Sequence, residues 1–378
     1  MLKLILMVSL FMIVYTYLIF PVFLFVITRI IGSANNNKDK VKAGDYHQSV
    51  AIVCAMYNEE KVLSRKIENF LSLNYSNVKL YIGSDGSTDR TNELLRKCSN
   101  IGNIVFFEFP RRGKVHVIND LVAKVQEDIV VFTDANSMFE PNAITALVKY
   151  FADPKIGAVC GLLKLLSPVK TTGEGFYWRY ETEIKKLESR LNCVIGANGA
   201  IFAVYKRLFR PLPLNTINDD FMISMRVIEQ GYGIKYAVDA IASEEVNKDD
   251  VVEFKRHIRD GAGHYRAMVH LYRLLNPLRI KIFFLYVSHR VIRWFVPLYL
   301  IILLILPLFY LGDPLIRGFY YSEICFYLLV LVGWISKTKV KVFYIPYYFI
   351  YINLALAVGF IKNIVGMQKV MWHSTARL

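Results

Sequence analysis

The sequence predicts an α/β fold: a doubly wound, mainly parallel sheet in the middle of the chain, flanked by transmembrane helices. Short β-rich apolar runs alternate with helical patterns from Ser49 onward, as in sheets whose parallel strands are joined by helices. Two of these runs end in an aspartate, Asp85 and Asp134, and α/β sheets bind ligands at the carboxyl ends of their strands. Finally, 54% of the 378 residues are hydrophobic, and the excess lies at the two ends of the chain.

The N-terminal segment predicts a membrane anchor. Residues 4–31 form an apolar run long enough to span hydrocarbon, broken only weakly by Ser9, Thr16 and Pro21. A cleaved signal peptide is the competing interpretation, but the apolar run is too long and residues 31–34 make a poor cleavage site. We therefore expect an uncleaved transmembrane helix over residues 1–31, followed by a polar linker over residues 32–48.

The central segment, residues 49–272, predicts one domain. Its apolar runs predict strands at residues 50–56, 78–83, 104–109 and 129–132. The intervening patterns predict helices at residues 59–73, 88–98 and 115–125. Beyond residue 173 the pattern becomes helical, at residues 174–190, 219–230 and 252–272. We then expect an interfacial amphipathic segment at 273–290 and a membrane block at 291–378, with spans near 291–311, 319–335 and 342–361.

The net charge of +15 comes from 46 Lys and Arg against 31 Asp and Glu. Nucleic acid is one partner class of basic proteins, but here the basic residues cluster beside the predicted spans. That placement fits the positive-inside rule and anionic lipid headgroups. We therefore expect membrane lipids rather than nucleic acid as partners, and a central domain in the cytoplasm.

The five cysteines are scattered, odd in number and without Cys-x-x-Cys spacing. This usage argues against both disulfides and a zinc site. Cys54 and Cys160 lie in strand-like apolar runs and are expected to be small core residues.

Polar residues gather where the first two predicted strands end. Asp85 lies in a Ser-Asp-Gly-Ser-Thr-Asp turn, where a purely structural role is possible because glycine permits positive φ and Ser or Thr caps a helix. The functional interpretation is that Asp85 accepts the imide N–H of uracil. Tyr57 and Glu59 stand at the end of the neighbouring strand, although Glu59 could also be an acid favoured by the helix dipole.

Two further motifs point to a metal-chelated diphosphate. Arg112 and Lys114 lie in an Arg-Arg-Gly-Lys loop, which is either a solvated turn or a diphosphate-binding loop on the same edge of the sheet. Asp134 and Asn136 form a variant of Asp-x-Asp, whose oxygens suit one Mg²⁺ or Mn²⁺ bridging a sugar-nucleotide diphosphate. An Asx-turn is the structural alternative there.

Six motifs in this order resemble family 2 glycosyltransferases. The chain looks like their membrane-bound branch, which includes cellulose synthase, hyaluronan synthase and poly-N-acetylglucosamine synthases. The motifs lie at residues 57–60, 84–89, 112–114, 134–136, 196–200 and 218–220, and residues 372–377 resemble the tail of that branch.

The resemblance implies a GT-A fold, inversion at the anomeric carbon and specific residue roles. Asp220 is the implied base and Asp219 its electrostatic neighbour, with helix capping as the alternative for both. Implied nucleotide-sugar contacts are those of Tyr57, Glu59, Asp85, Arg112, Lys114 and Asp134. Implied acceptor contacts are those of Trp178, Asn198, Gly199, Arg256 and Arg259.

The chain departs from the family at three places. Ser84 replaces the leading aspartate of the uridine motif, and Asn136 replaces the second acid of Asp-x-Asp. Asp260 stands where the Gln-x-x-Arg-Trp motif of processive synthases has the tryptophan that stacks on the acceptor. Trp178 or Tyr265 is a candidate replacement for that stacking face.

The segment from Ser288 to Trp294 has two interpretations. It is either the interfacial end of a span, with a snorkelling arginine and a tryptophan in the aromatic belt, or a guide for the product. On the first interpretation His289, like His270, is interfacial rather than catalytic.

These observations predict an inverting, metal-dependent glycosyltransferase of the cytoplasmic membrane. We expect it to move a sugar from a UDP-sugar to a saccharide or lipid-linked acceptor, for surface polysaccharide synthesis. One alternative adds a single sugar to a polyprenyl-linked acceptor. Another is a catalytically silent scaffold of a polysaccharide assembly complex. An accessory membrane subunit is a further possible partner. No motif encodes the identity of the sugar.

Overall fold

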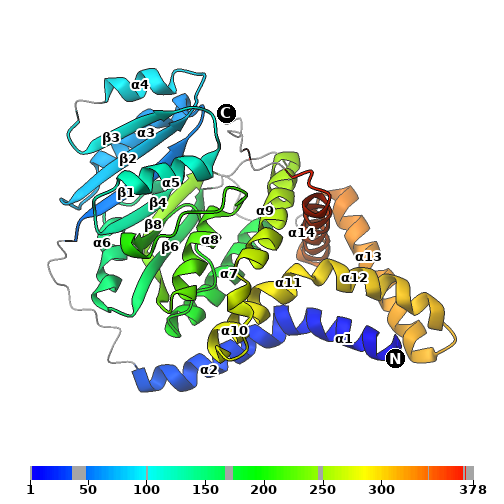
Figure 1. The fold of residues 1–378 in the computed structure, drawn as a ribbon. Helices are drawn as coiled ribbons and strands as arrows, with labels where there is room; N and C mark the ends of the chain where they lie inside the picture. Colours follow the sequence, from blue (N-terminus) through cyan, green and yellow to red (C-terminus); the bar gives the residue numbers. More distant parts are fainter. Residues whose placement is uncertain are drawn as a thin grey trace.

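We analysed a computed structural model of the full chain, which describes residues 2–35, 48–98, 101–166, 173–245, 250–338, 340–368 and 371. Most of the expected linker at 32–48 and the whole motif at 372–377 lie outside these residues. Figure 1 shows a three-layer α/β domain joined to a group of long helices.

The domain is built on one mixed sheet of eight strands in the order β3-β2-β1-β4-β7-β6-β8-β5. The strands are β1 (Val50–Met56), β2 (Val78–Asp85), β3 (Ile104–Phe109), β4 (Ile129–Thr133), β5 (Met138–Phe139), β6 (Ile156–Leu166), β7 (Phe202–Tyr205) and β8 (Gly233–Glu245). The four that the sequence predicts, β1 to β4, are parallel neighbours. Each residue of β1 is buried, as expected for a strand covered on both faces.

The second half of the sheet has no counterpart among the strands predicted from the sequence, apart from the strand-like run around Cys160. It is mixed: β7 is antiparallel to β4 and β6, whereas β8 is parallel to β6 and antiparallel to β5. β7 has four residues and β5 has two, so neither is long enough to show a pattern by itself.

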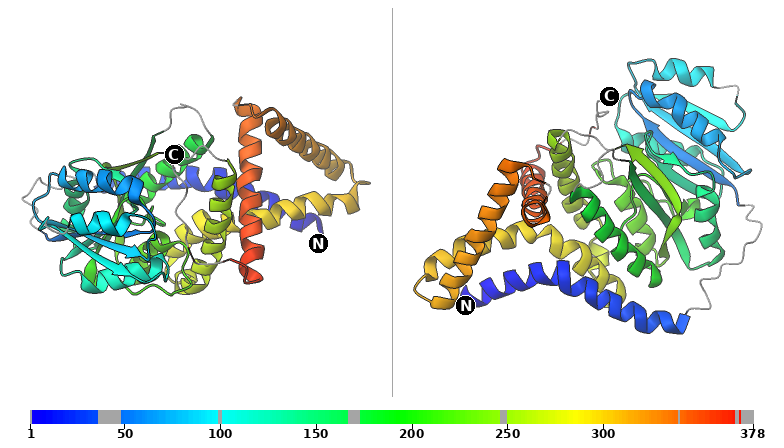
Figure 2. Two further views of the ribbon diagram at one scale, coloured as in Figure 1. Left: turned by 90° about the horizontal axis from the view of Figure 1, so that it is seen from above. Right: turned by 180° about the vertical axis from the view of Figure 1, so that it is seen from behind.

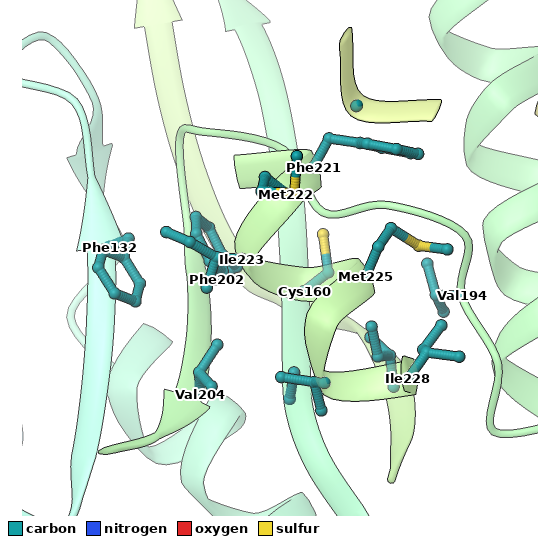
Figure 3. Close-up of a cluster of buried hydrophobic side chains, with 14 of the residues drawn as sticks. Phe132, Cys160, Val194, Phe202, Val204, Phe221, Met222, Ile223, Met225 and Ile228 are labelled. Atoms are coloured by element: carbon teal, nitrogen blue, oxygen red, sulfur yellow. The ribbon is translucent and has the colours of Figure 1, made fainter. Parts of the chain in front are cut away.

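Helices cover both faces of the sheet. One face packs against α3 (Glu60–Leu71), α4 (Thr91–Lys97) and α6 (Ala143–Val148), the last continued by a 3₁₀ turn (Lys149–Ala152). The other packs against α5 (Lys114–Lys124), α7 (Gly173–Arg190) and α8 (Asp219–Glu229). Figure 3 shows how Met222, Met225 and Ile228 of α8 join Phe202 and Cys160 of the sheet in one apolar core. This packing fixes the start of α8 at the carboxyl end of the parallel strands.

Three described helices are long and apolar enough to cross a membrane. The first, at Lys3–Ile30, comprises α1 (Leu2–Val14), a π-helical turn η1 (Tyr15–Ile19) and α2 (Phe20–Asn35). The others are α13 (Pro314–Ser336) and α14 (Lys341–Ile364). These agree with the anchor and with the last two predicted spans.

The span expected at 291–311 is wrong in its boundaries. Its place is taken by a helix pair, Ile280–Trp294 and Val296–Tyr310, bent by 51° at Phe295. The pair consists of α10 (Ile280–Tyr286), a π-helical turn η5 (Val287–Val291), α11 (Ile292–Trp294), α12 (Val296–Ile305) and a 3₁₀ turn η6 (Leu306–Tyr310). Pro297 in the first turn of α12 supplies no backbone donor, which favours the break.

One helix joins the two parts of the molecule. α9 (Asp250–His270) packs along α14, where a β-carbon on Gly359 would come within 2.5 Å of the Ile258 carbonyl oxygen. α9 also reaches the α8 start, because the Asp260 carbonyl accepts a hydrogen bond from Asn218 Nδ2 at 3.1 Å. The remaining 3₁₀ turns are Lys206–Leu208 and Tyr272–Leu275.

Candidate active site

Three charged side chains converge at the carboxyl ends of β1 and β4. Lys114, at the first residue of α5, places its Nζ 2.9 Å from Oδ1 of Asp134. The same Nζ lies 3.1 Å from Oδ2 of Asp219, at the first residue of α8. Burial by itself would lower the pKa of Lys114, but the carboxylates of Asp134, Asp219 and Asp220 outweigh it and raise that pKa. The lysine is therefore a fixed cation at the sheet edge.

Asp220 follows in the first turn of α8 and is partly exposed. Burial, and then the neighbouring charge of Asp219, raise its pKa to about 7. The backbone N–H of Phe221 donates to Oδ1 at 2.7 Å, which leaves Oδ2 facing the site. A carboxylate with a raised pKa beside a cation is a suitable proton acceptor near neutral pH.

Gly199 keeps a space open beside these carboxylates. A β-carbon there would lie 3.1 Å from Oδ2 of Asp134 and 3.7 Å from Oδ2 of Asp220. A small cavity touches the same place, lined in part by Lys114, Gly199 and Asp219. The absence of a side chain at Gly199 therefore gives small ligands access to both carboxylates.

The predicted role of Asp85 in uracil binding is not supported by the contacts of its carboxylate. The side chain is fully buried and accepts hydrogen bonds from the backbone N–H groups of Arg112, at 2.8 Å, and Gly113, at 3.0 Å. It also forms an ion pair with the guanidinium of Arg111. Asp85 thus shapes the 111–114 loop, and contact with a base would require this loop to move. Glycine is needed at 113 because its φ is +103°.

Besides Lys114, the cation of this loop that contacts a residue of the predicted nucleotide site is Arg111 rather than Arg112. Arg111 lies over the ring of Tyr57, with its guanidinium carbon 3.5 Å from the ring centroid. The guanidinium of Arg112 instead pairs with Asp120 on α5. Tyr57 and Arg111 are therefore brought together as a stacked pair, which the sequence motif did not reveal.

The turns after β1 and β2 are joined to each other. Asn58, with φ of +53°, donates from Nδ2 to Thr88 Oγ1 and accepts from the Thr88 N–H at 2.8 Å. The N–H of Glu59 donates to Thr91 Oγ1 at 2.9 Å, and the Glu59 side chain is buried. These contacts support a positioning role for Glu59 beside the Tyr57–Arg111 pair.

The donor set for a metal is small. Among the described residues, no group of three or more His, Cys, Asp or Glu side chains could hold a metal ion. Asp134 is 38% exposed at its side chain, Asn136 is partly exposed, and Gly199 leaves Oδ2 of Asp134 open. Two oxygen ligands with room for diphosphate oxygens and water fit Mg²⁺ or Mn²⁺, which commonly take few protein ligands.

The predicted acceptor residues are only partly brought together. Asn198 is buried and donates to the Gly161 carbonyl at 2.8 Å, so its side-chain amide is hydrogen-bonded to β6. Arg256 and Arg259 both lie on α9, where Arg256 is exposed and Arg259, which precedes Asp260, is partly exposed. Trp178 is partly buried on α7.

Tyr265 is not available as a stacking face. It is 5% exposed, its hydroxyl donates to the Trp294 carbonyl, and its ring centroid lies 4.6 Å from that of Phe360.

The interfacial interpretation of the 288–294 segment is wrong for its central residues. His289, Arg293 and Trp294 are buried, at 0%, 5% and 3% exposure, against α7 and α9 rather than at a membrane surface. Their partners on α7 include Glu181 and Glu188, which sequence reasoning missed. A spacing of seven residues places these two acids on one helix face, and this was the available signal.

The mixed sheet between two layers of helices, with a carboxylate–lysine cluster at its strand ends, agrees with the glycosyltransferases of GT-A fold. Residues 47–263 match the family model described as Glycosyltransferase like family 2. Because this match covers more than half of the chain, the chain belongs to that family.

Curated relatives include poly-β-1,6-N-acetyl-D-glucosamine synthases. That of Staphylococcus aureus (strain COL) is 26% identical over 273 residues, which are 70% of this chain and 65% of the relative. That of Staphylococcus epidermidis is 23% identical over 232 residues, 59% of this chain and 56% of the relative. The chain thus matches less than two thirds of the length of these relatives.

A solved structure resembles nearly the whole chain. It is a mannosyltransferase from Pyrobaculum calidifontis in complex with GDP-mannose and Mn²⁺, with a TM-score of 0.69 and 18% identity. The alignment covers 96% of this chain and 99% of the other, so the fold similarity includes the apolar helices.

Proposed function

We propose that this protein is an inverting, metal-dependent glycosyltransferase that moves a sugar from a UDP-sugar to a saccharide or lipid-linked acceptor for a surface polysaccharide. The observation that carries the proposal is the position of Asp220 beside the Lys114–Asp134–Asp219 cluster. A base and a diphosphate-neutralising group are the two functions that inverting transfer needs.

In this scheme the acceptor hydroxyl lies against Oδ2 of Asp220, which takes its proton as the oxygen attacks the anomeric carbon. The bond from that carbon to the diphosphate breaks, and the nucleoside diphosphate leaves with the bonding electron pair. Lys114 stabilises the developing charge, and Asp219 holds Lys114 in place. Asp134 and Asn136 would hold Mg²⁺ or Mn²⁺, which supplies further neutralisation of the diphosphate.

Tyr57 and Arg111 are the proposed nucleotide platform. The Tyr57 ring and the Arg111 guanidinium stacked on it follow β1 and β3, on either side of Asp85 at the end of β2. The exposed part of Tyr57 suits a planar base, and the Arg111 cation suits the adjacent phosphates.

The donor proposal favours an N-acetylhexosamine, since the curated relatives are named for N-acetyl-D-glucosamine. UDP-N-acetylglucosamine is therefore the first donor to test. GDP-mannose is the natural competitor, because the mannosyltransferase of similar fold was solved with it.

We place the domain at the cytoplasmic face of the cytoplasmic membrane. Arg29 near the end of the first span, Arg273 and Arg279 just before the bent pair, and Lys281 in its first turn support this orientation.

A panel of nucleotide sugars tests the proposal with the full-length protein in detergent. Release of UDP should be fastest with one UDP-sugar and should require a divalent cation. No turnover of any UDP-sugar, with GDP-mannose consumed instead, would overturn the donor assignment. No nucleotide release from any donor would favour the silent scaffold.

A further inference from the structure

A buried charge network joins α7 to the bent membrane pair. Nδ1 of His289 lies 2.6 Å from Oε1 of Glu188, and its Nε2 lies 3.3 Å from Oε2 of Glu181. Arg290 lies 3.2 Å from the same Glu181 oxygen, and Arg293 pairs with the other oxygen. The side chains of His289 and Glu188 are fully buried. Although burial would raise the pKa of Glu181, Arg293 and Arg290 hold it well below its usual range.

The N-terminal helix fixes the membrane side of this network. Thr16 donates to the Ser288 carbonyl at 2.8 Å, and the hydroxyls of Tyr15 and Ser288 lie 2.8 Å apart. The Phe20 ring stacks on His289 with centroids 6.0 Å apart. Both segments are π-helical at this contact, and Figure 2 shows the first helix running beside the bent pair.

On the other side the network ends at the backbone of one residue, Ile195. Its N–H donates to Oε2 of Glu188 at 3.0 Å. Its carbonyl accepts from Nε of Arg290 at 3.2 Å and from Nη2 at 3.1 Å. Ile195 is therefore held from both sides, by α7 and by the membrane pair.

Ile195 begins the short loop that leads to Gly199. Gly196 has φ of +92°, and a β-carbon there would lie 2.5 Å from the ring of Phe221, the residue after Asp220. The Ala197 N–H donates to Ser224 Oγ of α8 at 3.0 Å. With Asn198 bonded to β6, the residues Ile195, Ala197 and Asn198 each have a hydrogen bond to a group outside the loop. Glu188 and Arg290 supply the anchor at Ile195, so α7 and the membrane pair together hold the start of the loop that leads to Gly199 and its two carboxylates.

We propose that Arg290 and Glu188 are positioning residues: they hold the 195–199 loop so that Gly199 leaves the correct space beside Asp134 and Asp220. The inference rests on the proposed function, because it assumes that these carboxylates act on the donor and acceptor. If Arg290 and Glu188 position the loop, activity depends on the contacts between the bent pair and α7. The membrane helices are then linked to the active site.

Arg290 and Arg293 form a matched pair for the test. Both lie on the bent pair and both contact Glu181, but within the described part of the chain the hydrogen bonds to the loop come from Arg290. Arg290→Met removes one of the two arginines at Glu181, which stays paired with Arg293, and the Ile195 carbonyl loses the two donors from Arg290. Arg293→Met removes the other arginine and leaves those two donors in place, and Arg290→Lys restores one donor.

The first measurement is hydrogen exchange in the full-length protein without substrate. We expect faster exchange across residues 192–200 in Arg290→Met, but unchanged exchange there in Arg293→Met. Equal protection in both variants would overturn the inference, whatever the enzyme's donor.

The second measurement is steady-state transfer with the donor that the wild type uses. We expect kcat to fall by about 10-fold to 10²-fold in Arg290→Met with little change in the donor KM, since small displacements of reacting groups cost about this much. Arg290→Lys should recover part of kcat. A wild-type rate in folded Arg290→Met would refute the positioning role, whereas an inactive wild type would refute the proposed function instead.

Discussion

Gly199 lies against the carboxylate of Asp134, where an added β-carbon would be 3.1 Å from Oδ2. This separation is shorter than ordinary van der Waals contact, so any larger side chain must displace the carboxylate. Gly199 does not have a positive φ, so backbone conformation does not require glycine at this position. The close approach of the Asp134 carboxylate does.

Gly199→Ala should therefore reduce transfer without unfolding the protein. We expect kcat to fall by about tenfold, because the methyl group displaces Asp134 by a few tenths of an ångström and crowds the reacting groups. Gly102→Ala is the control, since a β-carbon there meets no atom within 4 Å. Equal rates for the two variants and the wild type would contradict the spacing role.

Asp220→Asn should abolish transfer while UDP binding stays nearly intact. The amide keeps the shape of the side chain but cannot accept the proton, and loss of a general base costs about 10²–10⁴-fold. Initial rates and UDP titration by calorimetry measure the two effects separately. Transfer above about a third of the wild-type rate would refute the assignment of the base.

Removal of divalent cations should stop the reaction. Activity should vanish with excess EDTA and return with Mn²⁺ or Mg²⁺, if Asp134 and Asn136 share one cation. Asn136→Asp should lower the metal concentration needed for half-maximal rate, because it adds an anionic oxygen ligand. Full activity in EDTA would mean that Lys114 and Arg111 neutralise the diphosphate without a metal ion.

Product length should be limited. By the resemblance to processive synthases, Asp260 stands where their Gln-x-x-Arg-Trp motif has a stacking tryptophan, and the buried Tyr265 cannot replace that side chain. We therefore expect a single addition or short distributive products, which sizing of radiolabelled product will measure. Long polymer formed early, while most acceptor remains unextended, would be the opposite result. Trp178→Ala then tests whether that side chain supplies the missing platform.

The parallel half of the sheet could be predicted from sequence because its determinants are local. β1, β2 and β4 are largely apolar runs of strand length, and an aspartate ends β2 and another follows β4. Lys114 and Asp134 could be expected at one edge of the sheet, because the carboxyl ends of parallel strands meet there. The roles of Asp219 and Asp220 were implied only by the resemblance to family 2 glycosyltransferases, and the fold brings Asp219 to Lys114.

Only the tertiary structure decided the partners of individual polar groups. The Asp85 carboxylate binds the 111–113 loop rather than remaining open, and Arg111 rather than Arg112 lies on Tyr57. His289 and Glu188 are 101 residues apart, yet they form a fully buried pair. Apolar periodicity records which face of a segment is buried, but not which distant segment covers it. A buried polar group must find a partner wherever the packed chain places one, and that choice is made by the fold as a whole.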